Sequence, residues 1–135
     1  MQKSYPPISL TKKNQIFVFG SNLAGRHGKG AALAAYKNYG AEYGVGVGRT
    51  GRCYAIPTKS QLFMTLPLPR IWNYVDDFIE YAKKNPKLEF LVTPFGTGLA
   101  GYDHKDIMIM FEERILPNNI IFPQVWLDLW GQDKR

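Results

Sequence analysis

Short apolar runs alternate along this 135-residue chain with segments of helical periodicity, and this alternation narrows the possible folds more than any other feature. The clearest segment, "PLPRIWNYVDDFIEYAKK", places Ile71, Val75, Phe78, Ile79 and Ala82 on one helical face. Strands that alternate with helices predict an α/β fold of three layers, with a central mixed, largely parallel sheet between helices. We expect strands over 15–20, 53–57, 88–96 (running into a loop) and 118–123, and helices over 30–39, 67–84 and 106–114.

The composition is that of one globular domain. The chain is 45% hydrophobic and 14% aromatic, which is enough to bury a core. Its apolar runs are shorter than the roughly 18 residues of a membrane span, and its first residues lack a signal-peptide pattern. We therefore expect a soluble, cytoplasmic protein without a membrane partner, with residues 1–135 as one domain and 1–14 as an N-terminal extension.

Metal-binding residues are scarce in the sequence. One cysteine, Cys53, and two histidines, His27 and His104, are too few for a zinc site built from these side chains. We expect neither a metal nor a cofactor. The net charge of +6 suits a phosphate-bearing partner, although surplus lysines on a solvated surface explain it equally well.

Three glycine- or proline-rich stretches lie at the ends of predicted strands: a first glycine stretch at residues 20–30, a short stretch at 57–60 and a second glycine stretch at 94–103. Ligands of parallel sheets bind beyond the carboxyl ends of the strands. The first stretch is not a P-loop, because Arg26 and His27 stand where that motif has lysine and serine or threonine. It also departs from the dinucleotide motif, because "GKGAAL" lacks the third small residue and no acidic residue ends a neighbouring strand about 20 positions later.

Glycine loops can bind a pyrophosphate with backbone N–H groups alone, without arginine or metal. Residues 96–101 would form one side of such a cradle and residues 28–30 the opposite wall. The alternative for each single glycine is an ordinary turn. The glycine-rich segment 44–51 is expected to be a mobile surface connection.

The order of three motifs resembles the macrodomain family over residues 16–123. These are "GKGAAL" at 28–33, a strand ending in "PTK" at 57–59, and "GTGLAG" at 96–101. Within the family, the chain is most similar to the DarG-like branch of ADP-ribosyl glycohydrolases, which remove ADP-ribose from DNA. The resemblance implies a macrodomain-like fold that binds ADP-ribose or a related nucleotide, with ADP-ribosylated DNA or protein as partners.

The resemblance also implies roles for individual residues. Asn22 would contact the distal ribose and Lys59 would attack its anomeric carbon. Asp103 is the nearest carboxylate to Ala100, the position of a catalytic aspartate in one subgroup. The expected ligand-binding residues are Gly20, Ser21, Asn22, Gly25, His27, Gly28, Lys29, Gly30, Thr58, Pro94, Gly96, Thr97, Gly98, Leu99, Ala100, Gly101 and Tyr102.

Each of these residues also has a purely structural interpretation. Asn22 could hold a turn, Lys59 could be an exposed strand-end lysine, and His27 and Tyr102 could be packing residues. The aspartate with which the family reads adenine has no counterpart in residues 4–15, so adenine recognition is left open. The aromatic segment 122–131 would either cap the core or form a partner surface.

Two functions of different classes follow from this pattern. The first is an enzyme that hydrolyses an ADP-ribosyl linkage on DNA, protein or a small molecule. The second is a non-catalytic protein that reads or sequesters ADP-ribose or a related NAD-derived signalling nucleotide. A structural protein without a ligand is a third alternative, because a fold by itself does not specify function.

Overall fold

The computed structural model describes residues 10–112 and 114–133, so residues 1–9 of the expected N-terminal extension lie outside the described residues. A 5-stranded sheet has the order β2-β3-β1-β4-β5. Strand β1 pairs in parallel with β3 and β4, and β4 with β5, whereas β2 is antiparallel to β3. The predicted mixed, largely parallel sheet is therefore confirmed. The strands are β1 Gln15–Asn22, β2 Gly48–Thr50, β3 Cys53–Lys59, β4 Glu89–Val92 and β5 Ile120–Ile121.

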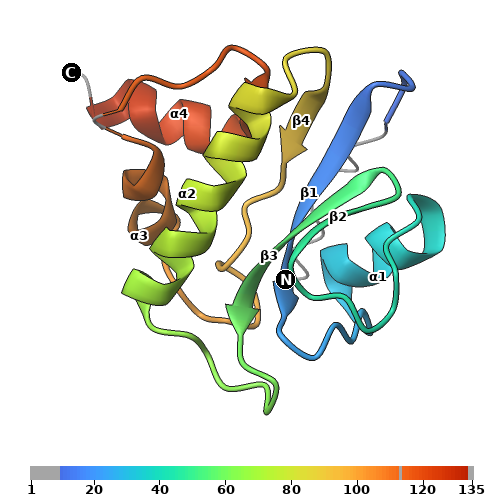
Figure 1. Ribbon diagram of the computed structural model, residues 1–135. Helices are drawn as coiled ribbons and strands as arrows, with labels where there is room; N and C mark the ends of the chain where they lie inside the picture. Colours follow the sequence, from blue (N-terminus) through green and yellow to red (C-terminus); the bar gives the residue numbers. More distant parts are fainter. Residues whose placement is uncertain (1–9, 113, 134–135) are drawn as a thin grey trace.

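Helices cover both faces of the sheet, which gives the three layers expected from the sequence (Figure 1). Helix α1 lies on one side and the other helices lie on the opposite side. The helical elements are α1 Gly30–Asn38, α2 Leu68–Lys84, α3 His104–Met108, the 3-10 turn η1 Ile109–Phe111 and α4 Gln124–Asp133.

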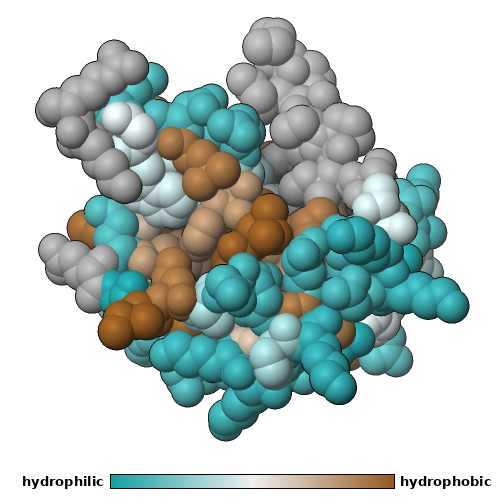
Figure 2. All heavy atoms as spheres, turned by 90° about the horizontal axis from the view of Figure 1, so that it is seen from above, coloured by the Kyte–Doolittle hydropathy of each residue, from teal (hydrophilic) through white to brown (hydrophobic). Residues whose placement is uncertain are grey.

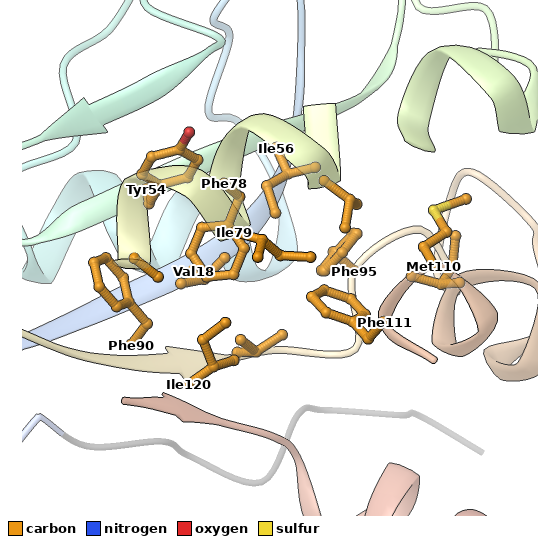
Figure 3. Packing of buried hydrophobic residues seen from close by; sticks show 14 of the residues in the cluster. Val18, Tyr54, Ile56, Phe78, Ile79, Phe90, Phe95, Met110, Phe111 and Ile120 are labelled. Carbon is orange, nitrogen blue, oxygen red and sulfur yellow. The ribbon is translucent and has the colours of Figure 1, made fainter. Parts of the chain in front are cut away.

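The alternation of side chains along β1 explains why there are two cores. Successive residues of a strand point to opposite faces, so Ile16 and Val18 face α2 while Phe17 and Phe19 face α1. The α2 side holds the larger apolar cluster, which includes Phe78 (Figure 3). The α1 side is lined mainly by small residues, among them Ala35, Cys53 and Ala55, so this helix can lie close to the sheet.

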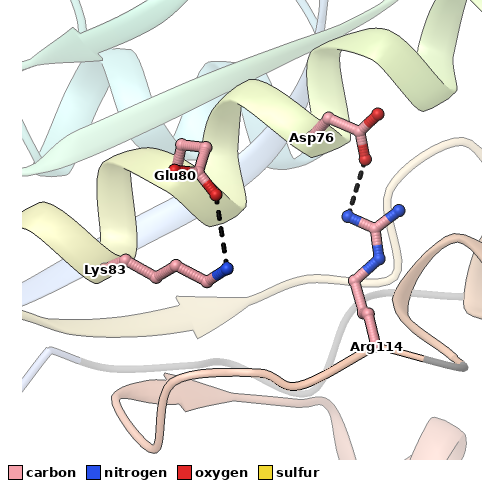
Figure 4. A network of polar contacts seen from close by, with 4 residues as sticks. All are labelled: Asp76, Glu80, Lys83 and Arg114. Carbon is pink, nitrogen blue, oxygen red and sulfur yellow. Dashed lines mark hydrogen bonds and ion pairs between the residues drawn. The ribbon is translucent and has the colours of Figure 1, made fainter.

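Helix α2 matches its predicted span and buries the apolar face read from the sequence. A proline near its first turn suits the helix start, because that position needs no N–H donor. On the solvent side, Asp76 pairs with Arg114 at 2.6 Å and Glu80 with Lys83 at 3.3 Å (Figure 4). The first pair connects α2 to the segment that follows η1, whereas the second is an exposed pair that contributes little stability.

Segment 44–51 was expected to be a mobile connection, and this expectation was wrong in part. Residues Gly48–Thr50 form the edge strand β2 on β3. Periodicity could not reveal a strand of this length, since it spans barely one alternation and contains glycine.

The third predicted helix also differs from the structure. It begins earlier, at His104, because Asp103 and Asp106 form a capping box there, and it turns into η1 at Ile109. Strand β4 ends at Val92, before the second glycine stretch, and β5 is limited to two residues.

The aromatic segment near the C-terminus caps the core. Trp126 of α4 is fully buried, and its ring lies 5.8 Å from that of Phe95 and 6.0 Å from that of Phe111. Its Nε1–H donates to Nδ1 of His104 at 2.9 Å. The core-cap interpretation is therefore confirmed for this tryptophan.

The two ends of the sheet have different surfaces. The arrows of β1, β3 and β4 point the same way in Figure 1, so their carboxyl ends share one edge. Figure 2 views the opposite edge, where hydrophilic side chains surround an exposed hydrophobic region. No helix in the described part of the chain is long and apolar enough to cross a membrane.

Candidate functional site

A cavity of about 830 Å³ opens at the carboxyl ends of β1 and β3. Its volume falls within the roughly 300–1,000 Å³ typical of small-molecule sites. Its walls come from the first glycine stretch with the start of α1, from Tyr43, from the end of β3 with Phe63 in the turn that follows it, and from the second glycine stretch. The lining residues are Gly20, Ser21, Asn22, Arg26, Gly28, Lys29, Gly30, Ala31, Ala32, Tyr43, Thr58, Lys59, Phe63, Phe95, Gly96, Gly98, Leu99 and Ala100.

The amino end of α1 forms one wall of this cavity. Lys29 is the N-cap residue and provides no side-chain cap, and no acidic residue lies in the first turn. The first N–H groups of a helix have no partner within the helix, and they carry the positive end of its dipole. Because Gly30, Ala31 and Ala32 line the cavity, this wall suits an anionic ligand.

The second glycine stretch forms the opposite wall. Gly101 N donates to Gly98 O and Tyr102 N donates to Gly96 O, each at 3.0 Å, which folds the loop back on itself. Within the described part of the chain, the N–H groups of residues 96–100 have no acceptor. These unpaired donors form a second group that a phosphate can satisfy.

Gly96 is required by the geometry of this loop. Its φ is +80°, and an added Cβ would lie 3.0 Å from Cδ1 of Ile107 in α3. A side chain here would therefore strain the backbone and press the loop away from the helix.

Asn22 holds the first loop closed from within. Its Oδ1 accepts from Arg26 N and its Nδ2 donates to Arg26 O, both at 2.9 Å. An amide retains a second N–H and a second lone pair after these bonds. Asn22 therefore acts as a turn residue, and its remaining donor and acceptor are free to serve the cavity that it lines.

A buttress behind the first loop, formed by residues 42–46, was missed by the sequence reading. Gly44 N donates to Gly25 O at 2.9 Å, and Ser21 Oγ donates to Gly46 O at 2.5 Å. An added Cβ at Gly25 would lie 2.3 Å from Gly44 C, and one at Gly46 would lie 2.1 Å from Asn22 O. The backbones meet so closely that only glycine fits. The available signal was the recurrence of glycine in both segments.

His27 lies behind the wall instead of in the cavity. It is 1% exposed, and its Nε2–H donates to Glu42 O at 2.9 Å. Its ring contacts those of Phe19 and Tyr43 edge to face. The packing interpretation therefore describes His27, while the half-exposed Tyr43 lines the cavity in its place.

Lys59 ends β3 directly beside Asn22. The two residues are partners in the β1–β3 register, just after an irregularity in the pairing, and Leu23 N donates to Lys59 O at 2.9 Å. Lys59 is half-buried and lines the cavity. With Arg26 and Lys29 it contributes positive charge, and no acidic side chain is among the described lining residues.

The structure separates several predicted residues from this cavity. Asp103, Thr97 and Tyr102 line a different and smaller pocket beside α3. The Asp103 carboxylate belongs to the capping box, and Tyr102 Oη donates to Leu66 O at 2.6 Å. Asp103 therefore does not contact the space beside Lys59. The other predicted residues outside the cavity lining are Gly25, His27, Pro94 and Gly101.

The donor set excludes a clustered metal site within the described part of the chain. No group of three or more histidine, cysteine, aspartate or glutamate side chains is arranged there to hold a metal ion. The cavity therefore offers backbone N–H groups, one amide, hydroxyls and three cations as its polar groups.

Comparison with known proteins identifies the fold. No protein-family model and no curated protein sequence matches this chain. A solved structure, the macrodomain of Mycobacterium tuberculosis DarG, matches with a TM-score of 0.65 at 19% identity, covering 88% of this chain and 95% of that one. Similarity over nearly the full length of both chains, with helices on both faces of a mostly parallel sheet, shows that this chain has the macrodomain fold.

Proposed function

We propose that the cavity binds ADP-ribose and that the chain hydrolyses an ADP-ribosyl linkage. One observation carries this proposal. Two sets of backbone N–H groups without acceptors, at the start of α1 and at residues 96–100, line the same cavity as Lys59, and the fold is that of a macrodomain. The amino end of α1 and residues 96–100 would hold the two phosphates between them. The distal ribose would then lie between Asn22 and Lys59, which neighbour each other across β1 and β3.

The chemistry proposed for Lys59 is nucleophilic. Its neutral Nζ would attack the anomeric carbon of the distal ribose as the bond to the acceptor breaks. The proton lost by the amine passes to the departing acceptor. Water then attacks the same carbon, frees ADP-ribose and regenerates the amine, so one water is consumed for each bond cleaved. Asn22 would hold the ribose hydroxyls during both steps.

A substitution series at Lys59 tests the enzymatic part of this proposal. Lys59→Ala should abolish release of ADP-ribose from modified DNA, protein and small ADP-ribosyl compounds. Binding of ADP-ribose by calorimetry should change little, because the loops hold the phosphates. Lys59→Arg retains the positive charge but should not restore turnover, since guanidinium stays protonated and is a poor nucleophile. Release by Lys59→Arg at the parental rate would contradict the nucleophile role.

The second candidate function is binding without turnover. The absence of acidic side chains among the described lining residues favours it, because no carboxylate is at hand to move protons during cleavage. If the parent binds ADP-ribose but releases none from any of the three substrate classes, this function is the correct one. Lys59→Ala would then weaken binding modestly by removing a cation near the phosphates.

A further inference from the structure

We propose that the turn at residues 60–64, with Phe63 as its central contact, determines which acceptor the site takes, and that this acceptor is a polypeptide with apolar side chains beside the ADP-ribosylated residue. The inference rests on the proposed function, because it assumes that the distal ribose lies next to Lys59. It extends that function by giving the turn at residues 60–64, which belongs to neither glycine loop, a role in selecting the acceptor.

Phe63 is held in a strained backbone conformation. Within the described part of the chain it is the only residue other than glycine with a positive φ, at 63°. The left-handed region is unfavourable for a residue with a Cβ, because the Cβ comes too close to the backbone carbonyl oxygen that follows it. A glycine or asparagine would relieve that strain, and a bulky aromatic residue is unusual in such a position. Strain of this kind concentrates at functional sites.

The turn around Phe63 is held by four hydrogen bonds centred on Ser60. Ser60 N donates to Met64 O at 2.8 Å, and Phe63 N donates to Ser60 O at 3.0 Å. Ser60 Oγ accepts from the N–H groups of Leu62 and Met64, each at 3.2 Å. These bonds hold the strained conformation in place, so the ring of Phe63 is presented in a defined position.

The turn is also attached to both functional elements of the cavity. It directly follows Lys59, which forms a bridge with Thr65 across the base of the turn. Thr65 Oγ1 donates to Ala100 O at 3.1 Å and thereby joins the turn to the second glycine loop. In Figure 1 the turn projects beyond the carboxyl ends of the strands. A group attached to a ribose beside Lys59 would leave the cavity along this turn.

Phe63 meets the first loop across the mouth of the cavity. The Arg26 guanidinium lies 5.8 Å from the centroid of the Phe63 ring, and both residues line the cavity. The residues on either side of Phe63 are exposed and apolar, since Leu62 is 82% exposed and Met64 68%, and Leu99, which lines the same cavity, is 72% exposed. Apolar side chains gathered at the rim of a cavity mark a binding surface, whereas scattered single ones do not.

The chemistry of this rim favours a polypeptide acceptor over a nucleic acid. Leucine and methionine side chains pack against apolar side chains of a partner, and methionine adapts readily to different shapes. Nucleic acid binding needs rows of cations that follow the phosphate backbone. The turn at residues 60–64 carries no lysine or arginine, and its residues Leu62, Phe63 and Met64 form a continuous apolar run in which Leu62 and Met64 are exposed.

Binding to matched conjugates tests the inference without depending on turnover. The Lys59→Ala protein would be titrated with free ADP-ribose, with a serine-linked ADP-ribosyl peptide flanked by leucines, and with the same peptide flanked by glycines. We expect the leucine-flanked peptide to bind about tenfold more tightly than free ADP-ribose, a difference of about 1.4 kcal/mol. The glycine-flanked peptide should bind about as well as ADP-ribose.

Variants of the turn then separate its role from that of the cradle. Phe63→Gly removes the ring and relieves the strain, and the double variant Leu62→Ser/Met64→Ser removes the aliphatic rim. Both should erase the gain for the leucine-flanked peptide. In Leu62→Ser/Met64→Ser, whose two residues do not line the cavity, the Kd of ADP-ribose should change less than about twofold. Phe63→Tyr keeps the ring and should keep the gain. Equal effects on the peptide and on ADP-ribose would overturn the inference.

Two further outcomes are distinct from each other. An ADP-ribosylated single-stranded oligonucleotide that binds more tightly than the leucine-flanked peptide would overturn the polypeptide assignment while leaving the proposed function intact. Failure of the protein with its native Lys59 to bind ADP-ribose would refute the proposed function, and the present inference with it.

Discussion

The two glycine loops line one cavity, but they differ in how they are supported. The first loop is closed from within by Asn22 and is also held from outside, because Gly25, Gly44 and Gly46 bring it and the buttress at 42–46 into direct backbone contact. The second loop is held mainly by bonds between its own residues, with one side-chain bond from Thr65. Its Leu99 is 72% exposed, and the N–H groups of residues 96–100 have no acceptor in the described part of the chain.

This contrast indicates that the first loop is a preformed wall of the cavity and that the second loop adapts to the ligand. Backbone groups without partners gain most from an anionic ligand, so the second loop should become more ordered when phosphate binds. The first loop already has its backbone and the Asn22 side chain engaged, so it should change little. Substitutions in the buttress should therefore affect folding, and substitutions in the second loop should affect binding.

The largest expected effect comes from breaking the buttress. Gly46→Val would place a Cβ 2.1 Å from Asn22 O, where neither backbone can give way easily. We expect the free energy of unfolding to fall by about 3 kcal/mol or more, as measured by urea denaturation. Gly131→Ala in α4 is the matched control, because no atom lies within 4 Å of its added Cβ. A Gly46→Val protein of parental stability would show that this contact is not needed.

Changing the second loop should affect affinity more than stability. Gly98→Glu adds bulk and negative charge where phosphate is proposed to bind, and should weaken ADP-ribose binding more than about tenfold, or 1.4 kcal/mol. Asn118→Glu places the same charge at the amino end of β5, away from the cavity, and should leave the Kd unchanged. Equal affinity of folded Gly98→Glu and the parent would mean that the phosphates bind elsewhere.

Substitution of Asn22 tests whether the first loop contacts the distal ribose directly, in addition to shaping the cavity. Asn22→Ala should weaken binding of ADP-ribose more than binding of AMP, because AMP lacks the distal ribose. Leaving a buried partner unpaired costs about 1–3 kcal/mol. Asn22→Asp keeps an acceptor for Arg26 N, so it separates loss of the turn from loss of the ribose contact. Equal losses for both ligands, measured by calorimetry, would place Asn22 away from the ribose.

The last prediction concerns the pH dependence of stability and rests on β3, the strand that carries Lys59. Burial raises the pKa of Cys53 from 9.0 to about 12. Burial, with a smaller contribution from Asp77, raises the pKa of Tyr54 from 10.0 to about 12. The fold favours the protonated forms, so the stabilisation is complete below about pH 9 and is lost as the pH rises towards 12.

Urea denaturation at pH 8 and pH 10.5 measures this loss. The parent should be less stable at the higher pH, and Cys53→Ala should lose less stability between the two than the parent does. The Cys53 thiol should also resist labelling until the chain unfolds, because it is fully buried. An equal loss of stability in both proteins would assign the alkaline effect to other groups.

Patterns local in sequence were sufficient to predict the layers of the fold and the glycine loops at the strand ends, whereas the roles expected of Asn22 and Lys59 came from the resemblance to macrodomains. Helical periodicity located α2, and apolar runs located β1, β3 and β4. Parallel strands share an edge at their carboxyl ends, so residues that follow these strands were expected to meet. The cavity accordingly brings together the predicted residues Gly20, Ser21, Asn22, Gly28, Lys29, Gly30, Thr58, Lys59, Gly96, Gly98, Leu99 and Ala100.

The positions of Asp103 and His27 could not be predicted from local patterns, because they depend on contacts with other segments. The sequence suggested Asp103 as a partner of Lys59 because it is close along the chain to Ala100, but the capping box of α3 turns it towards a different pocket. His27 seemed available to a ligand because it lies in the glycine stretch. Burial against Phe19 and a bond to Glu42 place it behind the wall instead.

The sequence by itself determined the α/β layering, the two glycine loops at strand ends and the lysine that ends β3, because each is written in the spacing of neighbouring residues. Only the tertiary structure decided that residues 42–46 support the first loop and that Phe63 faces Arg26 across the cavity mouth. The buttress depends on the absence of side chains where two backbones meet, and the Phe63 contact depends on a strained turn. Neither produces a periodic pattern, so each becomes visible only when the segments are placed together in space.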